Sequence, residues 1–138
     1  MISVRYHQAA EDELQSLAKG TVLGATIEGM GDASESDLLF EVPTPLGFRV
    51  RATRAYWEII ICIKHPVMAG RELEVKATLE HPEEIRQSRI DSDVYLFYRA
   101  EHESRWVCAV TKHLNEEGFL ITAYPTDAIK EGTTIWPK

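Results

Sequence analysis

The sequence has little cysteine, no long apolar run and no surplus of positive charge. Of its 138 residues only two are cysteines, Cys62 and Cys108, and both lie inside apolar stretches. Two isolated thiols favour the reducing cytoplasm over a disulfide-stabilised secreted fold. The longest apolar stretch, "WEIIICI" (57–63), is far shorter than the roughly 18 residues of a membrane-spanning helix. We therefore expect a cytoplasmic protein with no membrane segment and, because no apolar stretch follows a basic N-terminus, no signal peptide.

Several catalytic motifs are absent as well. The five histidines and two cysteines show no HxxxH, HxH or CxxC spacing, so the sequence predicts no metal site. There is no glycine-rich phosphate loop and no GxSxG turn, which leaves nucleotide hydrolysis and acyl transfer without a motif. We expect no cofactor.

The net charge of −7 argues against a general polyanion-binding protein, but the acidity is unevenly distributed. Residues 1–48 contain eight acidic and two basic residues, whereas the remainder contains 14 acidic and 13 basic ones. A phosphate-binding surface is therefore still compatible with the later part of the chain. We interpret 38–138 as the core of a single domain, 1–138, and 1–37 as an acidic strand-helix-loop extension. The extension either covers a cationic site or belongs to the scaffold.

The spacing of apolar residues predicts helices first and a sheet afterwards. Residues 3–20 have the pattern of a strand and a helix, and 38–42 with 48–52 that of a hairpin. Helices are expected over 54–64, after the N-cap residue Thr53, and over 69–80, although the isoleucines of 59–63 also suit a strand. Strands are expected over 93–99, 105–112 and 118–124; their short linkers predict an antiparallel meander. The predicted fold is α+β, with helices packed on a curved antiparallel sheet.

The polar residues of this sheet and of the preceding helix are of the kinds that metal-free RNA cleavage requires. A base removes the 2′-hydroxyl proton, an acid protonates the leaving 5′-oxygen, and cations or hydroxyl donors stabilise the charge on the phosphorus group. The candidates by residue type are His65, Arg86, Arg89, Tyr98, Arg99, Lys112, Thr122, Tyr124 and Thr126. Each also has a structural alternative: a histidine can end a helix, cations can pair with surface carboxylates, and tyrosines can pack in the core.

Strand geometry places Thr122 and Tyr124 on one face of the sheet, because side chains alternate along a strand. Whether Tyr98 and Lys112 share that face depends on the register of the hairpins, which a slip of one residue reverses.

Several stretches together resemble a known group of proteins. These stretches are Trp57, His65-Pro66, "HPEEIRQSR", "DVYLFYR", "VCAVTKHL" and "FLITAYPTDAIKEG" with Trp136. Over roughly residues 45–137 they resemble small prokaryotic and phage proteins of the barnase/EndoU/RelE-type nuclease fold. Separately, "VRYHQAAEDELQSL" is similar to the opening strand and helix of RelE-like and ParE-like toxins. The resemblance implies that the antiparallel sheet has four to five strands. It also implies a metal-independent endoribonuclease that forms 2′,3′-cyclic phosphate, often the toxin of a toxin–antitoxin pair.

From the residue types and the resemblance we select candidate site residues and partners. The catalytic candidates are His65, Arg99, Lys112, Thr122 and Tyr124. The substrate-binding candidates are Arg86, Arg89, Tyr98 and Thr126. RNA and an antitoxin protein are the implied partners. The chain departs from the group at Glu58-Ile59-Ile60, where relatives commonly have a histidine. The alternative is therefore a catalytically inactive interaction module of the same fold that binds a protein partner or RNA.

Overall fold

The computed structural model describes residues 21–22, 25–26 and 37–137. Its strands are β1 (Thr21–Val22), β2 (Ala25–Thr26), β3 (Leu38–Pro43), β4 (Arg49–Thr53), β5 (Glu84–Gln87), β6 (Val94–His102), β7 (Arg105–Leu114), β8 (Glu117–Thr126) and β9 (Thr133–Trp136). Its helices are α3 (Arg54–Ile59), the π-helix η2 (Ile60–Lys64), the 3-10 helix η3 (Pro66–Met68) and α4 (Glu72–Glu80). The strand and helix expected over 3–20 and the loop at 30–36 lie outside the described residues. None of the described helices is long and apolar enough to cross a membrane.

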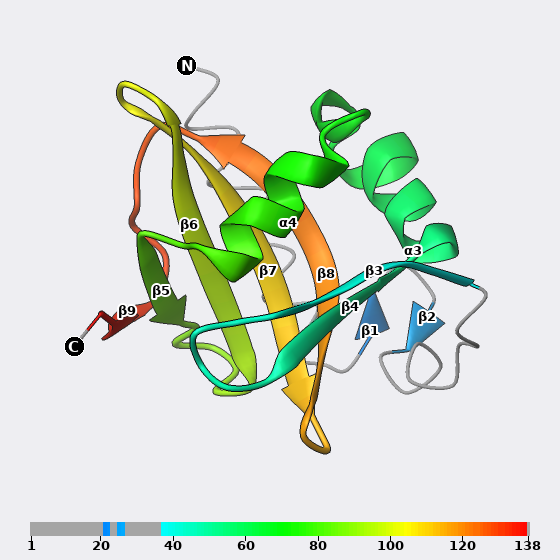
Figure 1. Ribbon diagram of the computed structural model, residues 1–138, viewed down its shortest axis with the longest axis horizontal. Helices are drawn as coiled ribbons and strands as arrows, with labels where there is room; N and C mark the ends of the chain where they lie inside the picture. The colour runs from blue at the N-terminus through cyan, green and yellow to red at the C-terminus, as the bar shows by residue number, and fades with distance from the viewer. Residues whose placement is uncertain (1–20, 23–24, 27–36, 138) are drawn as a thin grey trace.

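The expectation of helices packed on an antiparallel sheet of four to five strands is wrong. The described residues form mostly sheet: seven strands in the order β3-β4-β8-β7-β6-β5-β9, with two short α-helices (Figure 1). Strand β5 ("EIRQ") is short and mostly polar, and β9 ("TTIW") has residues that favour strands but is only four residues long, so neither was predicted. The sheet is mixed because β4 runs parallel to β8, with Val50 opposite Gly118. No local pattern indicates a pairing over such a sequence separation.

The predicted meander of β6, β7 and β8 is confirmed. Both pairs are antiparallel, from Val94 opposite Lys112 to Leu114 opposite Glu117. The β7–β8 hairpin turns over Asn115 and Glu116, whose φ angles of 52° and 69° are those of a two-residue type I′ turn. The hairpin of β3 and β4 is also as predicted.

Gly118 lets β4 come close to β8 where the two parallel strands meet. A Cβ atom at this position would lie 2.8 Å from the carbonyl oxygen of Arg49 and 2.8 Å from the ring of Phe48. Any other residue would therefore push β4 away from the meander.

The register of the meander defines two faces. Tyr98, Cys108 and Tyr124 are directly opposite one another on β6, β7 and β8, and we call their side the tyrosine face. Their neighbours along the strands project from the other side, the helix face. The first row on the helix face is Arg99, Val107 and Pro125.

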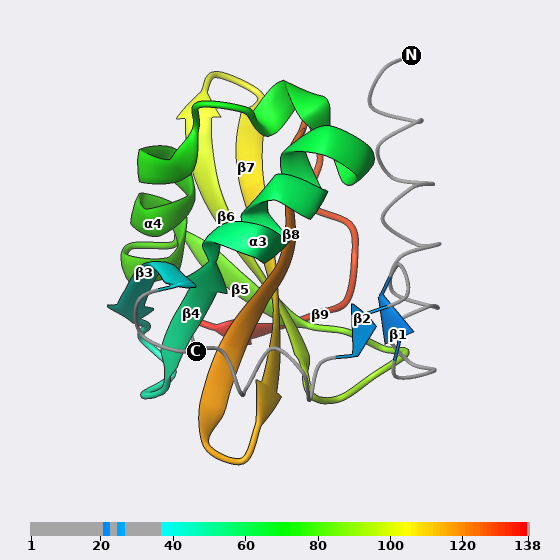
Figure 2. The same ribbon diagram turned by 90° about the vertical axis from the view of Figure 1, so that its right-hand side faces the viewer.

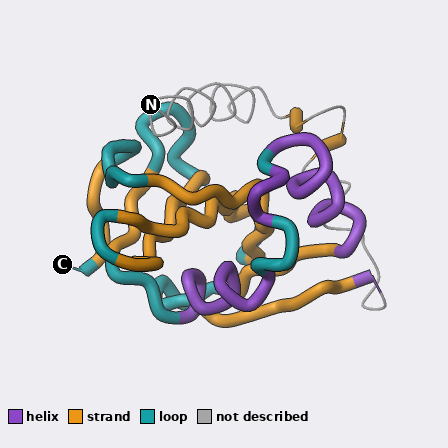
Figure 3. Tube along the Cα trace, turned by 90° about the horizontal axis from the view of Figure 1, so that it is seen from above, coloured by secondary structure: helices purple, strands orange, loops and turns teal. Residues whose placement is uncertain are grey.

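Different segments lie against these faces. Helix α4 packs on the helix face, with Val75 and Leu79 fully buried. The segment 127–132, which connects β8 to β9, runs on the side of the sheet away from α4 (Figure 2). The helical segment 54–64 lies beside β8 in Figures 1 and 2, and in the view from above it is separate from α4 (Figure 3). The part of β8 that β4 does not reach is thus bordered by the helical segment.

Candidate functional site

The helical segment 54–64 ends in a way that brings Lys64 and His65 to β8. Thr53 caps the start of α3, because its Oγ1 accepts a hydrogen bond from the Tyr56 N–H at 3.1 Å. After Ile59 the helix widens to the π-helix η2, and the His65 N–H donates to the Ile60 carbonyl at 2.7 Å. Pro66 has no N–H and ends the helix there. Turns of π-helix are rare and occur frequently at functional sites.

Lys64 connects the end of the helical segment to strand β8 by a hydrogen bond. Its Nζ donates to the carbonyl oxygen of Ile121 on β8 at 3.0 Å and to the hydroxyl of Tyr56 at 2.9 Å. The bond to Ile121 joins residues 57 positions apart, next to Thr122. Lys64 was not a candidate from the sequence. It is the last residue of the π-helix and precedes the His65-Pro66 pair, which is the one local signal that could have drawn attention to it.

His65 lies against Tyr124. Its side chain is only 4% exposed, and its ring centroid is 5.3 Å from that of Tyr124, at an interplanar angle of 40°. Because Tyr124 is opposite Cys108, and Cys108 is opposite Tyr98, the contact continues into the tyrosine face. Thr122 is two residues before Tyr124, opposite Val110, and so lies on the same face.

Three hydroxyl groups on this face, those of Tyr98, Thr122 and Tyr124, are buried and, among the described residues, have no oxygen or nitrogen hydrogen-bond partner. The weakly bonding Cys108 thiol lies next to the two tyrosine hydroxyls. More than nine in ten buried polar groups in proteins are hydrogen-bonded, so three such groups on one face require an explanation. We define His65, Tyr98, Thr122 and Tyr124 as the hydroxyl site.

Burial raises the pKa of both tyrosines far above the ordinary value. For Tyr98 and Tyr124 the loss of hydration is the main cause, and the neighbouring Cys108 thiol raises both pKa values further. The Glu131 carboxylate acts in the same direction on both. Both hydroxyls therefore keep their protons at neutral pH and can donate hydrogen bonds to an anionic oxygen.

Thr126 lies at the exit of β8 and has a clear structural role. Its Oγ1 accepts a hydrogen bond from the Ala128 N–H at 3.3 Å and donates to the Ala128 carbonyl at 3.1 Å. Thr126, a substrate-binding candidate, thus caps the backbone that follows it. The bonds direct the chain into the 127–132 segment.

The cationic candidates lie elsewhere. Arg99 projects from the helix face and donates to the His81 carbonyl at 2.7 Å. Lys112 is buried and pairs with Asp91. Arg86 pairs with Glu84 at 2.7 Å and donates to the carbonyl of Gly132 at 3.3 Å.

Arg89 is exposed, with its Nε 3.4 Å from the Thr133 hydroxyl. The structure thus brings His65, Thr122, Tyr124 and Tyr98 together, with Thr126 on the same strand as two of them. It does not bring Arg89, Arg99 or Lys112 to them. Arg86, on the neighbouring strand β5 and opposite Leu96, shares the face of Tyr98, and its charge acts to lower the pKa of the Tyr98 hydroxyl.

Across the described part of the chain, no three His, Cys, Asp or Glu side chains are grouped as metal ligands would be. Comparisons with family models, curated proteins and solved structures find no match. The functional argument therefore depends on the geometry of this chain.

Proposed function

We propose that this protein is a metal-independent endoribonuclease whose centre is the hydroxyl site. The observation that supports this most is the set of three buried hydroxyls, for which the described residues supply no oxygen or nitrogen partner, beside a buried histidine. Neutral hydroxyl donors held in a water-poor environment are suited to stabilising the charge that develops on a phosphate group during transesterification. RNA is the substrate, and an antitoxin protein is the expected partner in the cell.

The residues of the hydroxyl site have the following roles in the proposed reaction. His65 takes the proton of the RNA 2′-hydroxyl, and the 2′-oxygen attacks the adjacent phosphorus. Thr122, Tyr124 and Tyr98 donate hydrogen bonds to the non-bridging oxygens as negative charge builds up. The bond from phosphorus to the 5′-oxygen breaks, and His65 returns the proton to that oxygen. The products are a 2′,3′-cyclic phosphate and a free 5′-hydroxyl.

Lys64 holds the histidine of the hydroxyl site in position. With two of its hydrogen bonds reaching Tyr56 and Ile121, its ammonium group holds the end of the π-helix against β8. Lys64 therefore keeps the His65 ring in contact with Tyr124. It acts through His65 and is a positioning residue.

Access to the site requires movement. Because His65 is 4% exposed and Tyr124 is 1% exposed, an RNA phosphate reaches them only when a neighbouring segment moves aside. Residues 1–37, the acidic extension, are either such a cover or part of the scaffold. Most of them lie outside the described residues, so the cover stays a prediction: a chain that starts at Leu38 should bind RNA more tightly and with a steeper salt dependence.

The second candidate function is a catalytically inactive interaction module that binds a protein partner or RNA. It is favoured by the pairing of Lys112 with Asp91 and by the position of Arg99 on the opposite face, which leave the hydroxyl site without these two cations. The third cation, Arg86, is paired with Glu84. A cytoplasmic location is proposed for both functions, because Cys62 and Cys108, which both lie in the described part, are not joined in a disulfide.

One assay distinguishes the two candidate functions. Purified protein is incubated with total RNA in EDTA, and new fragments are tested for 2′,3′-cyclic phosphate ends. His65→Gln should lower the cleavage rate by about 100-fold or more, as loss of an acid–base group typically does. The matched control is His102→Gln, since His102 is 67% exposed in side-chain area and lies at the end of β6. Cleavage that is absent, or unchanged in His65→Gln, would favour the interaction module.

A further inference from the structure

A cavity of about 220 Å³ lies on the helix face, between α4 and the strands β6 and β7. Its polar lining consists of Glu74 and Thr78 from α4 and Arg99 and Glu101 from β6. Ala77, Ala100 and Val107 form the apolar part of its wall. The cavity is separate from the hydroxyl site, because Arg99 and Val107 project from the face opposite to Tyr98 and Cys108.

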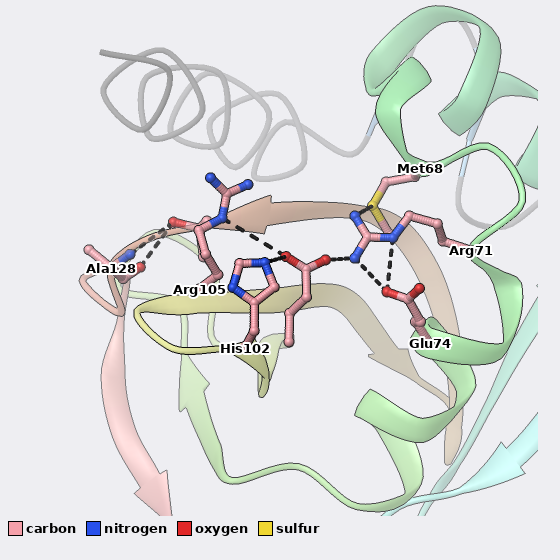
Figure 4. A network of polar contacts seen from close by, with 8 residues as sticks. Met68, Arg71, Glu74, His102, Arg105 and Ala128 are labelled. Atoms are coloured by element: carbon pink, nitrogen blue, oxygen red, sulfur yellow. Dashed lines mark hydrogen bonds and ion pairs between the residues drawn. The ribbon is translucent and has the colours of Figure 1, made fainter.

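The carboxylates at this cavity are held by a network of cations. Arg71 pairs with both Glu74 and Glu101, and its Nη1 also lies 3.9 Å from the sulfur of Met68 (Figure 4). Glu101 in addition lies 3.4 Å from His102 Nε2 and 3.9 Å from Arg105 Nε (Figure 4). Both oxygens of Glu101 are therefore engaged, and the carboxylate is fixed at the rim.

Arg99 is differently placed. Its Nη1 donates to the His81 carbonyl at 2.7 Å, and no carboxylate in the described part of the chain pairs with it. The remaining N–H groups of its guanidinium are a fork suited to a carboxylate ligand.

Acceptors for a cationic group come from α4. Arg71 occupies one oxygen of Glu74, Oε2, and leaves Oε1 with no partner that the described residues supply. The Thr78 hydroxyl donates to the Glu74 carbonyl at 2.8 Å, so its lone pairs can accept a further hydrogen bond. The cavity therefore offers donors for an anion and acceptors for an ammonium group.

The local charges balance. Arg71 pairs with Glu74 and Glu101, and Arg105 lies near Glu101. With Arg99 and with Glu83, whose carboxylate accepts the Ala100 N–H beside the cavity, three carboxylates match three guanidiniums in number. A ligand with a net charge would upset this balance, whereas one with both charges would preserve it. The volume is below the roughly 300–1,000 Å³ of pockets for drug-sized ligands and corresponds to about seven water molecules.

We propose that this cavity binds a small zwitterion of the size of a free α-amino acid with a short aliphatic side chain. The ligand carboxylate lies on the Arg99 guanidinium. Its ammonium group donates to Glu74 Oε1 and the Thr78 hydroxyl, and its side chain packs on Ala77, Ala100 and Val107. The proposal is independent of the ribonuclease function, because it concerns the opposite face of the sheet.

The test is a titration of the isotope-labelled full chain with glycine, L-alanine and L-valine, followed by amide chemical shifts. We expect saturable shifts in residues 74–78 and 99–101 with a dissociation constant of about 1 mM. Valine should bind several-fold more tightly than glycine because of the apolar wall. N-acetyl-alanine and alaninamide, which each lack one of the two charges, should bind about 10-fold more weakly or worse.

Two variants and one control complete the experiment. Arg99→Gln should weaken alanine binding by about 10-fold or more, and Ala77→Leu should abolish it by filling the cavity even if Arg99→Gln fails to fold. Arg89→Gln removes the same charge from an exposed position away from the cavity and should leave the dissociation constant unchanged. Absence of saturable shifts at about 10 mM amino acid, or equal binding of N-acetyl-alanine and alanine, would overturn the proposal.

Discussion

Replacement of Thr122 by valine should make the protein more stable and less active. The Thr122 side chain is 1% exposed, and its hydroxyl has no hydrogen-bond partner within the described structure. A buried hydroxyl without a partner costs about 1–3 kcal/mol relative to water, and valine has nearly the same shape without that cost. We expect the free energy of unfolding to rise by about 1–2 kcal/mol, which is roughly 3–8 °C in Tm for a domain of this size.

A matched control is available on the neighbouring strand. Thr111 is fully buried on β7, but its hydroxyl donates to the Tyr95 carbonyl at 3.3 Å. Thr111→Val should therefore lower the stability by about 0.5–1 kcal/mol, because a hydrogen bond is lost. The two substitutions are chemically identical and differ only in whether the hydroxyl has a partner.

The assay is urea unfolding followed by circular dichroism, with m-values compared to ensure that the unfolding transition is the same. Cleavage of RNA by Thr122→Val should fall at the same time, since a donor to the phosphate is removed. If both substitutions destabilise the protein by similar amounts, the Thr122 hydroxyl is satisfied in the folded state, and the argument for the hydroxyl site loses its main support.

Three further outcomes are expected. Glu116→Gly should raise the free energy of unfolding by about 0.5–1 kcal/mol in thermal melts, because Glu116 has a φ of 69° that glycine adopts without strain; a loss of stability would contradict the type I′ assignment. Absorbance at 295 nm should show two tyrosines that ionise only on unfolding, since the pKa values of Tyr98 and Tyr124 are raised in the folded state. The contribution of these two tyrosines to stability is complete below the unfolded pKa of about 10 and is lost as pH rises above it. Tyr124→Phe should leave only one tyrosine that ionises on unfolding. Lys64→Met should shift the NMR signals of the His65 ring and reduce cleavage more than binding of RNA, whereas Lys64→Arg should restore both; equal loss of cleavage and binding would indicate a merely structural role.

The parts of the fold that the sequence predicted are those with local signals. Alternation over 93–124 indicated the meander, and Thr53 marked the start of α3. The remainder depended on contacts between distant residues. The parallel pairing at Gly118 and the two short strands β5 and β9, of which β9 is at the edge, are specified by contacts of the finished sheet.

The candidate site shows the same division. Alternation was enough to place Thr122 and Tyr124 on one face, but the position of Tyr98 in their row depended on register. Residue type alone could not show that Arg99 lies away from the hydroxyl site. The alternation of side chains along β6 decides from which face of the sheet Arg99 projects. Lys64 could not be selected from the sequence, because its side chain would project in another direction from a helix of ordinary pitch. The π-helix sets the direction in which it projects.

The parallel contact between β4 and β8 also constrains the order in which the chain can fold. The meander is built from neighbours in sequence and can form early, because its two hairpin loops are short and cost little entropy to close. Strand β4 joins the meander only once β8 exists, because Val50 pairs with Gly118 across all the helices and strands that lie between them in the sequence. The hairpin of β3 and β4 should therefore dock last and open first, so that amide hydrogens of β3 and β4 exchange with solvent before those of β7. The last segment to dock would carry with it the start of the helix that holds His65, and the hydroxyl site would be completed only at the end of folding.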